Sequence, residues 1–247
     1  MKIINLTHRL ENGMYKYPSD PEPKINIVSA RLELKQKEIY DENGTLASYE
    51  IKKYKSGYSE LSIRNHHGTH LDAPAHKLPD GKKIGDYKTE RFINRAVIIN
   101  LTKSNILSRS DKEVRVNDIA QNIPNTNDFN ALIIYTGFCD LMQNNNLYKK
   151  ELEESFPYLK PIVAKYLSTN YEKLSLIGID SFSVDKRGSN SESHRELFKK
   201  DILILETLVN LSELNKEAAG KPFQLVSVPV FPSDMDASPT AAYAIIN

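Results

Sequence analysis

Four of the six histidines in this chain fall within the eleven residues from His66 to His76, a segment that also contains Asp72. Neutral imidazole and carboxylate groups together suit zinc, manganese or iron, whereas calcium and magnesium prefer oxygen ligands alone. Gly68 allows a tight backbone turn and Pro74 restricts one backbone dihedral, so the side chains can converge on one point. The segment therefore predicts a metal site. Its candidate ligands are His66, His70, Asp72 and His76.

The same spacing argues against a metalloprotease helix. His66 and His70 would share one helix face as in His-Glu-x-x-His zinc sites, but no glutamate follows His66 here. Residues 61–64 alternate like a strand, so we expect the ligands on the loop that leaves it. His67 is expected to point away and pack. Asp72 has two oxygens and can bridge two metals, although an aspartate before Ala-Pro also suits a turn.

A second pair of candidate ligands lies far downstream. The sequence from Ser193 to Glu196 has the form of a capping box, which puts Ser193 at the N-cap and His194 at the first position of a short helix. Glu206 directly follows the apolar residues 202–205, where a carboxylate is costly unless something pairs with it. Each would more often be structural when read alone. Together they would complete a second coordination sphere if the fold brings them near the first segment.

Short apolar runs rich in β-branched residues recur along the chain and predict strands rather than helices. These runs are residues 2–6, 25–34, 49–55, 61–64, 96–101, 131–135, 174–179, 202–205, 223–230 and 241–246. Asn43-Gly44 between alternating stretches predicts a long β-hairpin over residues 31–55, near the N-terminus. Pro161 suits the first position of a helix that feeds a following strand. We therefore expect a single α/β, strand-rich domain over residues 1–247.

The amino-acid composition argues against several classes of function. Lys plus Arg number 33 and Asp plus Glu number 32, and this balance argues against nucleic-acid binding. The single cysteine, Cys139, excludes an intramolecular disulfide and an all-thiolate zinc site, and we expect it to be a buried hydrophobe rather than a nucleophile. No apolar run suits a signal segment or a membrane span. We expect a cytoplasmic protein that acts on a small molecule and has no membrane or nucleic-acid partner.

The histidine-rich segment resembles the H-x-G-T-H-x-D-x-P-x-H signature of the cyclase-like metal-dependent hydrolase family, which includes bacterial kynurenine formamidase and isatin hydrolase. His194 and Glu206, separated by twelve positions, match the downstream histidine and glutamate of that family. The resemblance extends over nearly the whole chain. Its further stretches are residues 4–8, 136–138, 178–185 and 236–239.

The resemblance implies two sets of ligands that share a carboxylate: His66, His70 and Asp72 for one ion, and Asp72, His194 and Glu206 for the other. Asp72 and Glu206 would bridge two zinc ions, or manganese in their place, and His76 would be the proton shuttle. The family fold is a swivelling β/β/α domain. Family members are commonly dimers or larger assemblies, so we expect a homodimer or higher homo-oligomer, with the hairpin as a candidate exchange arm.

The substrate side of the site departs from the kynurenine formamidases, which pack a tryptophan of a short Trp-Pro segment on the substrate. This chain has no tryptophan, and Tyr17-Pro18 stands at the matching place. Tyr17 can still stack on a substrate ring. The leading hypothesis is a metal-dependent hydrolase that cleaves a C–N bond of a small amide, a formamide such as N-formylkynurenine, or a cyclic lactam, using metal-activated water. The alternatives are metal-dependent cyclisation or dehydration of a small keto compound, and a non-catalytic metal-binding module.

Overall fold

The computed structural model describes residues 1–247 except 41–45, 127, 145–148, 231–233 and 247, and it leaves the side chains of residues 32–54 and 144 undescribed. The chain divides into two compact units. The first comprises Met1–Leu10, Met14–Pro21 and Arg64–Asn247, and the second comprises Glu11–Gly13 and Glu22–Ile63. The expectation of one domain over residues 1–247 stays a prediction.

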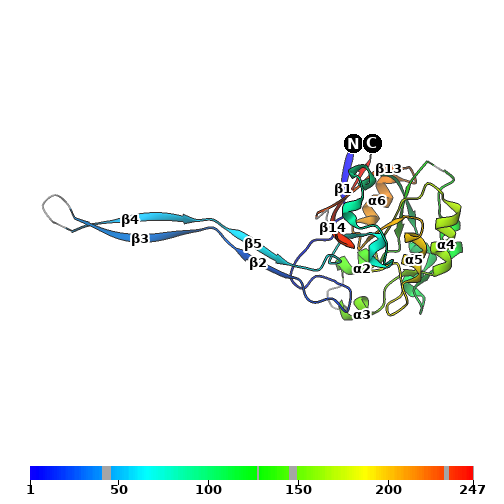
Figure 1. Cartoon of the computed structure of the whole chain (residues 1–247), viewed down its shortest axis with the longest axis horizontal. Coiled ribbons are helices and arrows are strands. Elements are labelled where there is room, and N and C mark those ends of the chain that lie inside the picture. The colour runs from blue at the N-terminus through cyan, green and yellow to red at the C-terminus, as the bar shows by residue number, and fades with distance from the viewer. Residues whose placement is uncertain (41–45, 127, 145–148, 231–233, 247) are drawn as a thin grey trace. The chain divides into compact units, whose positions relative to one another are not determined.

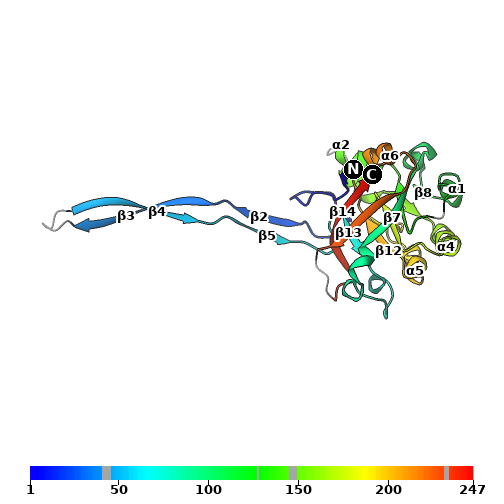
Figure 2. The ribbon, with the colours of Figure 1, turned by 90° about the horizontal axis from the view of Figure 1, so that it is seen from above.

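A closed sheet forms the centre of the first unit (Figure 2). Within the described residues its strands follow the order β1 (Lys2–Asn5), β14 (Ala237–Ile246), β13 (Phe223–Pro229), β7 (Ile93–Asn100), β9 (Ala131–Tyr135), β11 (Leu176–Ile179), β12 (Leu203–Glu206) and β6 (His70–Asp72). Because β6 also pairs with β14, seven of these described strands close into a barrel-like ring. The expected strand-rich α/β fold is confirmed.

The strands of the ring separate two apolar cores, since successive side chains of a strand point to opposite faces. On β9, Ile133 belongs to one core and Ile134 to the other, and Leu205 and Ile204 divide in the same way on β12. The parallel strands β9, β11 and β12 are buried along their whole length, which explains why their sequences are continuously apolar. By contrast, the antiparallel β13 alternates between buried and exposed residues.

Helices cover the ring on both core faces. Leu211 of α6 lies in one core, while Val163 of α4 and Leu197 of α5 lie in the other. Figure 2 shows α1, α4 and α5 gathered beside one another. The α-helices are α1 (Val116–Ala120), α2 (Phe138–Asn144), α3 (Lys149–Glu154), α4 (Pro161–Asn170), α5 (Glu192–Phe198) and α6 (Leu211–Ala218). The helix predicted to begin at Pro161 is confirmed.

Short elements complete the first unit. Its 3-10 helices are η1 (Pro74–His76), η2 (Ile84–Asp86), η3 (Thr89–Phe92), η4 (Thr102–Ser104) and η5 (Ile106–Ser108), and two further strands, β8 (Glu113–Val114) and β10 (Tyr158–Leu159), pair in parallel. No described helix has the length and apolar character that crossing a membrane requires.

The second unit consists of antiparallel strand pairs (Figure 1). β2 (Lys24–Val28) pairs with β5 (Tyr58–Ser62), and β3 (Arg31–Tyr40) pairs with β4 (Leu46–Lys55). The single strand predicted over residues 25–34 is wrong, because β2 and β3 are separate and pair with different partners. The turn predicted at Asn43-Gly44 lies outside the described residues, so the complete hairpin stays a prediction.

Candidate metal centre and pocket

The closure of the ring brings the two predicted ligand segments together. β6 carries His70 and Asp72 and pairs antiparallel with β12, whose final residue is Glu206. In this register His70 lies directly opposite Glu206. Residues from distant parts of the sequence thereby become neighbours on adjacent strands.

Asp72 lies in the middle of the resulting cluster. Its Oδ1 is 3.1 Å from His66 Nδ1 and 3.4 Å from His70 Nε2, and its Oδ2 is 3.3 Å from His194 Nε2. Glu206 closes the other side, with Oε2 3.4 Å from His70 Nε2 and Oε1 3.5 Å from His194 Nε2. Apart from His66, which is one-fifth exposed, these side chains are almost wholly buried. The structure therefore brings all five predicted ligands together.

Two buried atoms of the cluster have no hydrogen-bond partner among the described residues and could bind a cation. Among the described residues, neither His70 Nε2 nor Asp72 Oδ1 has a hydrogen-bond partner, although both are buried. His70 Nδ1 donates to the carbonyl of Gly68 at 2.9 Å, so Nε2 of the neutral ring offers a lone pair. Ligand atoms about 2.1 Å from a tetrahedral zinc ion lie roughly 3.4 Å apart, close to the separations in this cluster. The donor set fits a divalent metal.

In the metal-free protein, the histidines and carboxylates of the cluster shift one another's pKa values. Burial by itself lowers the pKa of His66, but Asp72 and Asp236 outweigh it and raise this pKa to about 10. Burial is likewise outweighed at His194, where Asp185 and Asp72 raise the pKa to about 9. Although burial opposes ionisation of Asp72, the neighbouring histidines hold the pKa of its carboxyl well below the usual range. An ionised carboxylate is thus available to a cation at neutral pH.

Asp185 aims His194 at the cluster. Its carboxylate accepts the backbone N–H groups of Ser193 at 2.9 Å and of His194 at 3.1 Å, and it also accepts His194 Nδ1 at 2.6 Å. Ring atom Nε2 is left facing Asp72. A carboxylate that orients a metal-binding histidine in this way is a common feature of metal sites.

The capping box predicted at Ser193 is wrong. The N-cap of α5 is Ser191, and Ser193 lies inside the helix with its Oγ donating to the carbonyl of Leu159 at 2.9 Å. His194 is therefore at the third helical position, not the first. The N–H groups at the start of a helix have no partner within the helix, and in α5 two of them donate to Asp185 of the preceding loop. A local capping pattern in the sequence does not reveal such a partner.

His76 lies beside the cluster at the end of η1. Its Nδ1 donates to Asp236 Oδ2 at 2.8 Å, and the centre of its ring is 4.3 Å from that of His66 and 5.5 Å from that of His194. Asp236 Oδ2 also lies 3.2 Å from His66 Nε2. Hydrogen bonds from these histidines lower the pKa of Asp236. Neither Asp236 nor Asp185 was predicted as a site residue, although both lie in stretches that resemble the family.

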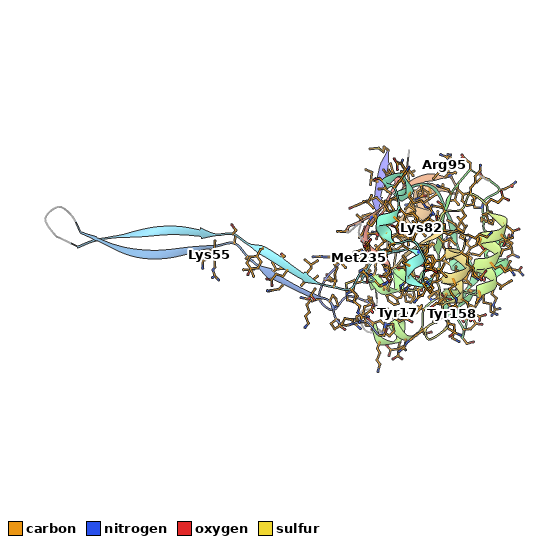
Figure 3. All side chains as sticks on the ribbon, viewed as in Figure 1. Tyr17, Lys55, Lys82, Arg95, Tyr158 and Met235 are labelled. Atoms are coloured by element: carbon orange, nitrogen blue, oxygen red, sulfur yellow. The ribbon has the colours of Figure 1, made fainter. Side chains whose placement is uncertain are left out.

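A pocket of about 560 Å³ opens onto the cluster and is lined by residues of the first unit. Tyr17, labelled in Figure 3, lines it together with Phe182. The ring of Tyr17 packs on Phe156 at a centroid distance of 5.9 Å, and Phe156 in turn packs on Phe182 at 5.6 Å. Burial raises the pKa of the Tyr17 hydroxyl, so it stays neutral. The pocket therefore joins an aromatic wall to a polar, histidine-rich floor.

The predictions for His67 and Cys139 concern residues outside the ligand set. His67 is fully buried, and its Nδ1 accepts the backbone N–H of Arg64 at 3.1 Å, so it packs away from the cluster as expected. Cys139 is also fully buried, as expected, and burial raises the pKa of its thiol. A thiol in this environment is unsuited to act as a nucleophile.

Known proteins resemble this chain in sequence and in fold. The family model described as Putative cyclase matches residues 4–186, and the chain belongs to this family. A kynurenine formamidase of Bacillus anthracis is 31% identical over 242 residues, which covers 98% of this chain and 96% of that protein. A kynurenine formamidase of Bacillus cereus is 31% identical over 201 residues, covering 79% and 85%.

Solved structures share the fold. Isatin hydrolase A from Labrenzia aggregata superposes with a TM-score of 0.70 at 18% identity, covering 99% of this chain and 93% of that chain. A predicted metal-dependent hydrolase from Bacillus stearothermophilus has a TM-score of 0.66 at 19% identity, with coverage of 98% and 97%.

Proposed function

We propose that this protein is a metal-dependent hydrolase that cleaves the C–N bond of a small amide, formamide or cyclic lactam. The observation that carries the proposal is the buried convergence of five metal-capable side chains, two with unbonded atoms, on the floor of a pocket. Relatives that are 31% identical over most of the chain bear the name kynurenine formamidase, which supports hydrolysis of an amide bond.

The ligands would hold two zinc ions, or manganese in their place. His66, His70 and Asp72 would bind one ion, and Asp72, His194 and Glu206 would bind the other. The two oxygens of Asp72 face different histidines, which suits a bridging role. When bound, a divalent cation would polarise the substrate carbonyl and lower the pKa of water.

His76 would move the protons of the reaction. Its ring contacts Asp236, lies beside His194 of the cluster and lines the pocket, where it would meet the water that attacks the substrate. A neutral imidazole can accept a proton from the attacking water and return it to the leaving nitrogen. We expect His76→Gln to lower kcat on an amide about 100-fold or more while the protein keeps its metal.

Tyr17 would bind the substrate. Its neutral phenol lines the pocket and is supported from behind by Phe156, so it can present an edge or face to an aromatic ring. We further propose that the barrel-like sheet is a swivelling β/β/α domain, that the chain assembles as a homodimer or larger homo-oligomer, and that its compartment is the cytoplasm.

The proposal is tested by initial rates on N-formylkynurenine for protein reloaded with zinc or with manganese, beside a chelated sample. We expect turnover that disappears on chelation and returns with the preferred metal. The proposed hydrolase function fails if fully loaded protein hydrolyses neither this substrate nor other formamides, small amides or lactams.

A further inference from the structure

Asp236 makes contacts to two histidines of the site through a single oxygen. Its Oδ2 lies 2.8 Å from His76 Nδ1 and 3.2 Å from His66 Nε2. An ionised carboxylate only accepts hydrogen bonds, so each of these ring nitrogens donates its proton to Asp236. The opposite nitrogen of His66, Nδ1, faces Asp72 of the cluster at 3.1 Å.

The carboxylate of Asp236 is held in place by the residues around it. Asn65 Nδ2 donates to Oδ1 at 2.6 Å, and the carbonyl of Asp236 accepts the backbone N–H of Ala73 at 2.9 Å. The preceding carbonyl, of Met235, accepts the N–H of Ile84 at 2.9 Å. Asp236 therefore has a fixed position relative to the segment that bears His76, although its side chain is 38% exposed.

We infer that Asp236 is a positioning residue that holds the proton of His76 on Nδ1 and turns Nε2 toward the metal cluster. The inference rests on the proposed role of His76 in hydrolysis. A ring nitrogen of His76 lies within 4.8 Å of ligand atoms of both Asp72 and His194, so the imidazole spans the distance between Asp236 and the cluster. In the other tautomer, Nε2 would carry a proton and could not accept one from water.

The substitution Asp236→Asn reverses the hydrogen-bonding character of the atom that faces His76. Because Asn65 donates to Oδ1, the amide oxygen of the new side chain would stay at that place and its NH2 group would face the histidines. The NH2 group cannot accept the proton on Nδ1. A matched control is Asp234→Asn, which removes the same charge two residues earlier from a side chain that is 90% exposed.

The kinetic test compares formanilide with phenyl formate at saturating zinc. Aniline must be protonated to leave, whereas phenoxide can leave without a proton. Hydrolysis of formanilide therefore needs His76 both to accept a proton from water and to return it, while hydrolysis of phenyl formate needs only the first of these steps. We expect Asp236→Asn to lower kcat for formanilide about 100-fold, with KM unchanged, and to lower kcat for phenyl formate less, by about 10-fold. Asp234→Asn should match the unsubstituted protein. Equal losses on both substrates, or no loss on formanilide, would overturn the inference.

A second measurement does not depend on turnover. In zinc-loaded protein with 15N-labelled histidine, NMR reports which ring nitrogen of His76 carries the proton, and His76→Gln identifies its signals. We expect the proton on Nδ1 in the unsubstituted protein and in Asp234→Asn, and a shift toward Nε2 in Asp236→Asn. A proton on Nε2 in the unsubstituted protein would refute the positioning role. If the proton is on Nδ1 but neither formyl compound is hydrolysed, it is the proposed hydrolase function that fails.

Discussion

His66 and His194 are two of the proposed metal ligands, and their protonation bears on how a metal would bind. Buried carboxylates raise their pKa values to about 10 and about 9, from an ordinary value of 6.5. Both imidazoles therefore hold an additional proton at neutral pH in the metal-free protein. Coordination requires the neutral ring, so the metal must displace these protons.

We therefore expect zinc binding at pH 7 to release at least two protons per chain, including one from each of these histidines. Titration calorimetry in buffers of different ionisation enthalpy measures this release. The apparent affinity should rise with pH and level off near pH 10. A binding enthalpy that is the same in every buffer would contradict this account.

The same shifts predict how the chelated protein responds to pH. A histidine whose folded pKa is raised contributes stability that is complete below about pH 6.5 and is lost as the pH rises through the folded value. The Tm of chelated protein should therefore fall between pH 7 and pH 10. Zinc-loaded protein, whose rings are already neutral, should show a smaller decline over this window.

At the scale of elements, Asp185 links the start of α5 to the orientation of His194. We expect Asp185→Asn to lower metal affinity about 10- to 100-fold, because an amide has a single acceptor oxygen in place of the two carboxylate oxygens that accept the three N–H groups of Ser193 and His194. Glu192→Gln is the matched control, since it removes an acidic group from the first turn of the same helix. Competition with a chelating dye measures both variants. Equal affinities for the two would count against the positioning of His194 by Asp185.

Gly81 supports the short element that carries His76. A Cβ atom at this position would lie 2.3 Å from the carbonyl carbon of Pro74 and 2.5 Å from the backbone nitrogen of Ala75. Backbone atoms cannot swing aside as a flexible side chain can, so η1 would have to move. We expect Gly81→Ala to lower the free energy of unfolding by about 1–3 kcal/mol, measured by urea titration. Unchanged stability would show that the turn adapts freely.

The two ligand segments were predictable from sequence because each concentrates its chemistry locally, in residues 66–76 and at His194 and Glu206. The supporting carboxylates were not. Asp185 and Asp236 act on histidines that lie elsewhere in the chain, and only the folded loops bring them there. In the same way, the buried strands were found from their apolar runs. The pairing of β6 with β14, which closes the ring, depends on tertiary packing that no local pattern records.

Every described residue that lines the site pocket belongs to the first unit. Lys24 pairs with Ser62, so the start of β2 and the end of β5 lie side by side. A short linker can therefore join the residues before Lys24 to those after Ser62. We expect a chain in which residues 24–62 are replaced by a short Gly-Ser linker to keep its metal. Metal analysis of the purified variant measures this. Loss of the metal would show that the first unit does not hold its site alone.

The strand-paired second unit also bears on assembly. Ile27, Tyr58 and Leu61 are each more than half exposed, and two-stranded ribbons are marginally stable in water unless something packs on them. We expect light scattering to give the mass of a dimer or a larger assembly for the intact chain. A monomeric mass would count against the proposed homo-oligomer.

The pairing of β6 between β12 and β14 has a consequence for biosynthesis. A ribosome produces the histidine-rich segment early, but β12 follows much later and β14 follows every other strand of the ring. Such non-local pairing is slow to form. Until β14 has emerged, β6, which carries His70 and Asp72, lacks one of its two partner strands. Nascent chains should therefore capture metal poorly, and loading should follow the synthesis of β14.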